Sequence, residues 1–176
     1  EILREKGTDR SRFFRGEVDR YTWCDVGSSY VPGELTAAFL MPQLEDARRI
    51  TDERLRLWAH YHATLAPLEQ AGRLRRPVLP PAVRHNAHMY QVLLPRAAQR
   101  PAVIRRMREL GASPVFHYVP LHSSPAGRRF GRAHGELPVT DDVAERLLRL
   151  PLWVGIDAPT VMHCFTAALA DAERGA

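Results

Sequence analysis

Residues 5–40 read EKGTDRSRFFRGEVDRYTWCDVGSSYVPGELTAAFL, and this stretch decides the fold. Its first part, residues 8–32, is predicted to be a loop, because glycine, proline and serine recur in it. The same loop carries five aromatic residues, Phe13, Phe14, Tyr21, Trp23 and Tyr30. A long aromatic-rich loop is uncommon in a compact domain and is often functional. Two interpretations stay open at this point: a loop packed over a core, and a loop that belongs to a binding site.

A long helical segment is predicted after the loop. Apolar residues recur every three to five positions across residues 33–71, which indicates one long helix or two nearly continuous helices. Pro42 is expected to kink or break this segment, because proline has no N–H for the helical hydrogen bond. Gly72 is expected to end it, because glycine adopts the left-handed conformation that often follows a helix.

From residue 73 onward, strands and helices alternate, and their order predicts a small α/β sandwich. The predicted elements are a strand over 89–94, a helix over 101–110, a strand over 114–119, a helix capped by Thr140 and ended by Pro151, a short extended piece over 152–156, and a final helix that Asp157 opens.

The charge of the chain argues against nucleic-acid binding. The formal net charge is +5, but arginine supplies 24 of the 25 basic residues and is spread along the chain beside 20 acidic residues. Proteins that follow a phosphate backbone usually cluster their positive charge. We therefore rank a nucleic-acid-binding protein last among the function classes considered.

The cysteine count and the hydropathy pattern favour a cytoplasmic protein that does not associate with membranes. Cys24 and Cys164 are too few for a disulfide framework or a zinc site. No apolar run approaches the roughly 20 residues that cross a bilayer. The pairs His60–His62 and His85–His88 have no convincing third ligand, so no metal is expected.

The chain resembles the DegT/DnrJ/EryC1/StrS group of fold-type-I enzymes that use pyridoxal phosphate (PLP). The resemblance covers four separated blocks in the same order: residues 5–44, NAHMY at 86–90, FHYVPLH at 116–122 and ERLLRLPL at 145–152. It implies an aspartate aminotransferase-like α/β fold, of which this chain would be the C-terminal part. Residues 1–50 would then be the end of the large PLP-binding domain and the start of a long connecting helix, and residues 51–176 the small domain.

Within that group, GTDRSRFFRGEVDRYTW and DVGSSY look like the dTDP-4-dehydro-6-deoxyglucose transaminases of enterobacterial-common-antigen type. The resemblance implies transfer of an amino group, usually from glutamate, to the C4 ketone of a dTDP-linked sugar, for cell-surface polysaccharide or deoxysugar synthesis. The implied cofactor is PLP. The implied partners are the nucleotide sugar, an amino-acid donor and a second copy of the enzyme in a homodimer.

The resemblance also assigns site residues. Ser29 stands where most of the family has an asparagine that reaches the PLP phosphate of the neighbouring subunit, and Ser28 precedes it. Their hydroxyls and the backbone N–H groups of a glycine-containing loop suit an anion, although a merely capped loop would use the same residues. Val31 stands at a family arginine position, so that arginine's role does not carry over.

Four further residues are candidates for substrate binding. The resemblance implies that His117, beside Tyr118, faces the sugar nucleotide, where an imidazole can donate to a phosphate or sugar oxygen. Tyr21 and Trp23 are expected to form a wall over the sugar or the base. The competing interpretations are a core histidine bound to backbone groups and aromatic packing in a core or an interface.

No catalytic residue is predicted within the chain. Lys6 is its only lysine, and it lies at an expected helix end before Gly7 rather than in the setting of the family's Schiff-base lysine. We therefore expect this chain to lack the covalent PLP anchor and to be inactive by itself. The alternative is a non-catalytic remnant that serves in dimerisation or ligand binding.

Overall fold

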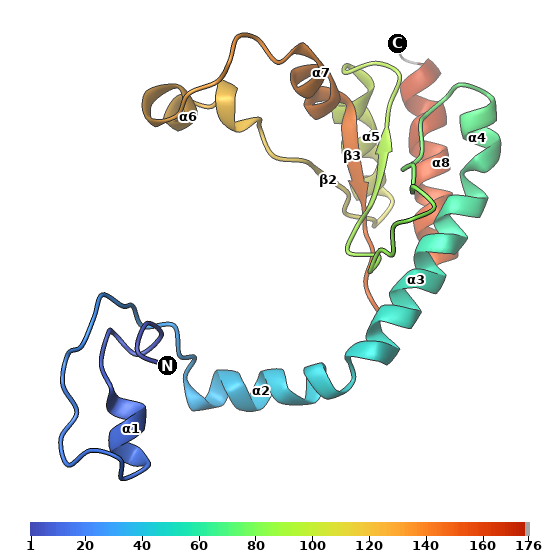
Figure 1. Ribbon diagram of the computed structural model, residues 1–176. Helices are drawn as coiled ribbons and strands as arrows, with labels where there is room; N and C mark the ends of the chain where they lie inside the picture. Colours follow the sequence, from blue (N-terminus) through green and yellow to red (C-terminus); the bar gives the residue numbers. More distant parts are fainter. Residues whose placement is uncertain (175–176) are drawn as a thin grey trace. The chain divides into compact units, whose positions relative to one another are not determined.

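The structure is a computed structural model that describes residues 1–174, and it divides into two compact units (Figure 1). Unit 1 comprises Glu1–Ala47, and unit 2 begins at Arg48. Each unit is described by itself below. The predicted assignment of residues 1–50 to a larger domain stays a prediction.

The N-terminal loop of unit 1 is held by two isolated backbone pairings. Glu5 pairs with Ser29, and Thr8 pairs with Trp23, both antiparallel. The short helix α1, Arg10–Phe14, lies inside the segment that the Thr8–Trp23 pairing closes. Asp9 is buried, and its Oδ1 accepts a 2.6 Å hydrogen bond from the backbone N–H of Thr22. The predicted loop is therefore an ordered turn structure, because side-chain and backbone hydrogen bonds replace regular strands.

Three helices occupy the segment predicted as helical: α2 (Glu34–Glu45), α3 (Ala47–Thr64) and α4 (Ala66–Gln70). The expected break at Pro42 is wrong in position, since Pro42 lies inside α2 and the interruption falls at Asp46. The carbonyl of Pro42 still accepts a 3.1 Å bond from the N–H of Asp46, because proline lacks only the donor. Gly72 has φ +69° and follows α4, as predicted.

Unit 2 contains a three-stranded antiparallel sheet. Its strands are β1 (Tyr90–Leu93), β2 (Val115–Phe116) and β3 (Leu147–Leu150), in the order β1-β3-β2. Tyr90 pairs with Leu150 and Val92 with Leu148, so these four buried side chains share one face. The last strand in the sequence is therefore the central strand of the sheet.

The helix predicted from Thr140 to Pro151 is wrong at both ends. The helix α7 spans Pro138–Arg146 and begins at a proline, whose fixed φ and missing N–H suit a first helical position. Residues 147–150 form β3 instead. Backbone hydrogen bonds to β1 and β2, on either side, replace the hydrogen bonds that these residues would make within a helix. The strand predicted over 152–156 is also wrong: Gly155 has φ +86° and the chain turns there.

The remaining elements follow the predicted order. The helix α5 spans Gln99–Glu109 and α8 spans Ala158–Arg174, and these two helices pack on each other. The 3₁₀ turn η1 (Leu121–Ser123) and the helix α6 (Pro125–Phe130) lie in the connection from β2 to α7. The strand β2 is shorter than predicted, since it is an edge strand that pairs only with part of β3.

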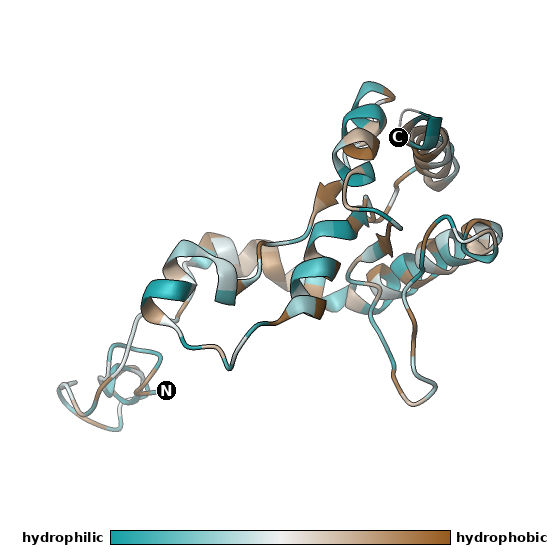
Figure 2. Cartoon of the chain, turned by 90° about the horizontal axis from the view of Figure 1, so that it is seen from above, coloured by the Kyte–Doolittle hydropathy of each residue, from teal (hydrophilic) through white to brown (hydrophobic). Residues whose placement is uncertain are grey.

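One hydrophobic core joins the sheet to the helices of unit 2. Its largest fully buried side chains include Tyr61 of α3, Tyr90 of β1, Met107 of α5, Leu148 of β3 and Phe165 of α8. The helices of this unit carry both polar and apolar segments, as amphipathic helices on a core do (Figure 2). The predicted α/β sandwich is confirmed.

Candidate functional site

A cavity of about 430 Å³ lies in unit 1 and brings together two of the predicted site residues. Ser29 and Tyr21 both line it. Three basic residues, Arg4, Lys6 and Arg10, line it as well. This volume is within the range of small-molecule sites, which is about 300–1,000 Å³. The basic lining suits a ligand that carries negative charge.

The two acidic residues of this cavity do not neutralise it. Glu5 is engaged locally, because its Oε2 accepts hydrogen bonds from the N–H and the hydroxyl of Ser11 at 3.1 and 2.6 Å. Glu34 is the other acidic lining residue and opens α2. Three formal positive charges therefore stand against two negative ones, of which one is already hydrogen-bonded.

Backbone contacts fix the position of Ser29 within this cavity. The N–H of Lys6 donates to the carbonyl of Ser28 at 3.1 Å, and the N–H of Tyr30 donates to the carbonyl of Arg4 at 3.0 Å. A Cβ atom at Gly27 would lie 2.1 Å from the backbone nitrogen of Gly7, so only glycine allows this close approach. The exposed Ser29 hydroxyl makes no hydrogen bond to any described residue and can serve a ligand.

The structure separates the two predicted aromatic wall residues. The ring of Tyr21 packs edge-to-face on Phe13 with 5.7 Å between centroids, and Arg10 lies 5.9 Å from its centre. Trp23 is 74% exposed and does not line this cavity, and neither does Ser28. Of the unit 1 candidates, Ser29 and Tyr21 therefore share a site, while Trp23 and Ser28 lie beside it.

His117 and Tyr118 lie in unit 2, directly after β2. Both line two cavities, of about 450 and 650 Å³. Within residues 1–174 the buried Nδ1 of His117 has no hydrogen-bond partner, which excludes the interpretation as a core histidine satisfied by backbone. Tyr118 is 78% exposed, and the larger cavity also contains Arg100 and Arg128. An imidazole with an unpartnered nitrogen and two guanidinium groups suit an anionic or oxygen-rich ligand.

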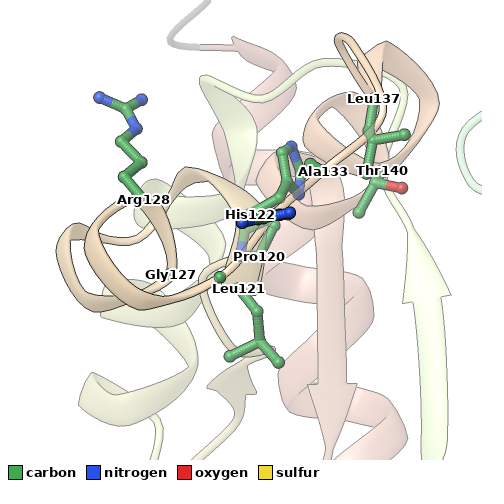
Figure 3. A pocket seen from close by; sticks show the side chains of 10 residues that line it. Pro120, Leu121, His122, Gly127, Arg128, Ala133, Leu137 and Thr140 are labelled. Carbon is green, nitrogen blue, oxygen red and sulfur yellow. The ribbon is translucent and has the colours of Figure 1, made fainter.

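A histidine–carboxylate pair beside these cavities was not predicted. His122 Nε2 lies 3.2 Å from Asp141 Oδ2, and His122 is mostly buried. His122 lines a further cavity of about 610 Å³, where Figure 3 shows its ring near Thr140 while Arg128 points away. The sequence carried no signal for the pair, because 19 residues separate its members.

A further histidine, His62, lies in an aromatic cluster away from these cavities. The ring of His62 stacks on Trp58 with 4.6 Å between centroids, and its Nδ1 lies 3.3 Å from the hydroxyl of Tyr90. Burial, followed by the nearby Arg76, lowers the pKa of His62 from its ordinary value. This histidine has a structural role.

Neither metal ligation nor membrane insertion is indicated by the described residues. Over residues 1–174, no three histidine, cysteine or acidic side chains come together as metal ligands. None of the helices in this range has both the length and the apolar character of a membrane span.

Comparison with known proteins identifies the class. The sequence profile of the DegT/DnrJ/EryC1/StrS aminotransferase family matches residues 1–167, so the chain belongs to this family. Among its relatives is the dTDP-3-amino-3,4,6-trideoxy-alpha-D-glucose transaminase of Streptomyces venezuelae, with 28% identity over 94% of this chain and 43% of the relative.

Solved structures of similar proteins agree with the fold. The aminotransferase TlmJ from Streptoalloteichus hindustanus has 25% identity and a TM-score of 0.78, covering 98% of this chain and 44% of TlmJ. DesV from Streptomyces venezuelae has 25% identity and a TM-score of 0.79, covering 98% of this chain and 43% of DesV. The PMP-form of the sugar aminotransferase Spr1654 from Streptococcus pneumoniae shares the fold at 18% identity. Its TM-score is 0.80, and the match covers 98% of this chain and 42% of Spr1654. The chain thus spans less than half the length of these relatives.

Proposed function

We propose that this chain is the C-terminal portion of a PLP-dependent aminotransferase that acts on a nucleotide sugar. The reaction would transfer an amino group, from glutamate, to the C4 keto group of a dTDP-4-dehydro-6-deoxyhexose. The family membership supports the reaction class. The observation that carries the proposal is the basic cavity of unit 1, which places the open Ser29 hydroxyl among Arg4, Lys6 and Arg10.

The residues of this cavity fit the phosphate end of PLP. When bound, PLP supplies an electron sink for the carbon that exchanges nitrogen. Ser29 would donate its hydroxyl hydrogen to a phosphate oxygen, and the nearby cations would offset the phosphate charge. Tyr21 would present an apolar ring wall beside them.

The cavities around residues 117–123 support a sugar-nucleotide site. The unpartnered His117 Nδ1 would bond to a sugar or phosphate oxygen, and Arg128 would bind a phosphate of the nucleotide. Tyr118 would cover the ligand with its exposed ring. A cavity of about 650 Å³ has room for the sugar with part of the diphosphate.

A second candidate is amino transfer at C3 of the sugar. It is favoured by the Streptomyces venezuelae relative, whose name places the amino group at that carbon. The two candidates differ in the position of the keto group, and the product named for the relative also lacks the oxygen at C4. Assays of the longer protein that carries this sequence, with glutamate and either the 4-keto or the 3-keto dTDP sugar, separate them. Turnover of neither substrate would contradict the proposal.

We propose that Lys6 does not anchor the cofactor covalently and that the PLP lysine lies in a part of the enzyme outside these residues. Lys6 has φ +64°, and its backbone N–H is bonded to Ser28, so it is part of the turn that holds Ser29. The test is an absorbance scan of this chain with PLP, before and after borohydride. No stable adduct on Lys6 is expected; a stoichiometric adduct there, mapped by mass spectrometry, would contradict this assignment.

The proposed complete enzyme is a cytoplasmic homodimer. The apolar residues Leu35, Phe39 and Leu44 of α2 are all largely exposed in unit 1, as expected for a surface that another part of the enzyme covers. Cys24 and Cys164 are free thiols, which fits a reducing compartment. A non-catalytic remnant would bind the nucleotide sugar or dimerise without any turnover in the complete protein.

A further inference from the structure

A small cavity of about 140 Å³ lies beside the sheet of unit 2, apart from the cavities of the proposed function. Arg149 of β3 and Val115 of β2 line it, together with His88, Ser113 and the segment from Leu150 to Leu152. None of its lining residues is acidic. Its polar side chains are therefore a guanidinium, an imidazole and a hydroxyl, all of which can donate hydrogen bonds.

The sheet fixes the position of Arg149. Arg149 lies on the central strand, where it pairs with Gln91 of β1 and Val115 of β2. Side chains alternate along a strand, so Arg149 is on the face opposite the buried Leu148 and Leu150. Its two cross-strand neighbours carry no charge, and neither supplies a counter-ion.

The guanidinium of Arg149 has an unsatisfied donor. Within the described part of the chain, its buried Nε has no hydrogen-bond partner. Other arginines of unit 2, such as Arg73, Arg76 and Arg146, are paired with carboxylates at their guanidinium groups. A buried, unpaired N–H on a cation is unfavourable, so its retention points to a partner that completes it.

We propose that Arg149, with His88 and Ser113, binds a small oxoanion in this cavity. The cavity of about 140 Å³ has room for a single carboxylate or phosphate group. The planar guanidinium fork matches both kinds of group. The site rests on unit 2 alone and does not depend on the proposed aminotransferase activity.

The test uses this chain with inorganic phosphate or acetate as probes at constant ionic strength. The thermal unfolding midpoint should rise saturably with one probe or both in the wild type. Arg149→Gln should abolish this rise. Arg105→Gln is the matched control, because it removes the same charge from an exposed position on α5 and should respond like the wild type.

A second measurement does not depend on the stability of the variant. In the ¹⁵N-labelled wild-type chain, the Arg149 Nε–H resonance, assigned with Arg149→Lys, should shift saturably during the titration. A response to phosphate alone indicates a phosphate group as the natural ligand, and a response to acetate alone indicates a carboxylate. Equal responses in Arg149→Gln and the wild type, or an unmoved resonance, overturn the site and leave the proposed aminotransferase function unaffected.

Discussion

The hydroxyl of Tyr61 donates a 2.8 Å hydrogen bond to the carbonyl oxygen of Pro151, 90 residues later in the chain. The bond connects α3 to the segment that follows the central strand. Tyr61 is fully buried, and burial, with a smaller effect of Asp157, raises its pKa. The hydroxyl therefore stays protonated and remains a donor across the physiological pH range.

Removing this donor should destabilise unit 2. In Tyr61→Phe the carbonyl of Pro151 loses its partner in a buried place, which costs about 1–3 kcal/mol. Urea unfolding of the chain measures the loss. Tyr118→Phe is the control, because its ring is mostly exposed, and it should change the unfolding free energy by less than about 0.5 kcal/mol. Equal effects of the two substitutions would contradict the assigned role.

A matched pair of leucines tests whether residues 147–150 form a strand. Leu148 is fully buried in the core, whereas Leu147 is only half-buried on the other face. Leu148→Ala should lower the free energy of unfolding by about 2–5 kcal/mol, and Leu147→Ala should lower it clearly less. The helical interpretation, which places Leu147 and Leu150 on the apolar side, predicts the reverse order. Urea unfolding of both variants decides between them.

The stability of the chain should fall with acid because of His62. Its pKa is lower in the folded state, so the unfolded chain binds the proton first as the pH falls. The stability is fully present above the ordinary value of 6.5 and is lost as the pH falls through that value toward the lowered folded pKa. His62→Asn should flatten this dependence from about pH 8 to about pH 5.

The control for His62 is His134→Asn, which changes an exposed histidine. It should leave the pH dependence of the unfolding free energy as in the wild type. If the unfolding free energy of His62→Asn depends on pH as steeply as that of the wild type, other groups cause the acid sensitivity.

Ser29 and Ser28 provide a matched test of cofactor binding in the longer protein that carries this sequence. Ser29 lines the unit 1 cavity and Ser28 does not. Ser29→Ala should weaken PLP binding about fivefold, the equivalent of one hydrogen bond of about 1 kcal/mol. Ser28→Ala should have a smaller effect. Titration of each apo-protein with PLP measures both, and a larger effect at Ser28 would contradict the geometry.

Local signals in the sequence predicted much of the fold. The helices α5 and α8 and the strand β1 were predicted within a few residues, because periodicity and glycine or proline mark their ends. The strand β3 was missed because the spacing of Val143, Leu147 and Leu150 also fits a helix. Only its pairing with two distant strands makes it a strand.

The candidate site was predictable as far as residue types allow. The family motifs indicated Ser29 and His117, and the structure places both beside cavities. The pairing of His122 with Asp141 and the unpartnered Nε of Arg149 depend on how the chain folds back on itself. Neither feature can be recognised from residue types or spacing in the sequence, so both became visible only in the three-dimensional structure.

The strand order β1-β3-β2 also constrains how the protein forms during synthesis. The strands β1 and β2 do not pair with each other, and their shared partner is made last (Figure 1). Until Leu150 has left the ribosome, both strands keep unpaired edges that other chains can join. A nascent chain halted before Leu147 should therefore recruit chaperones, and extension past Leu150 should release them.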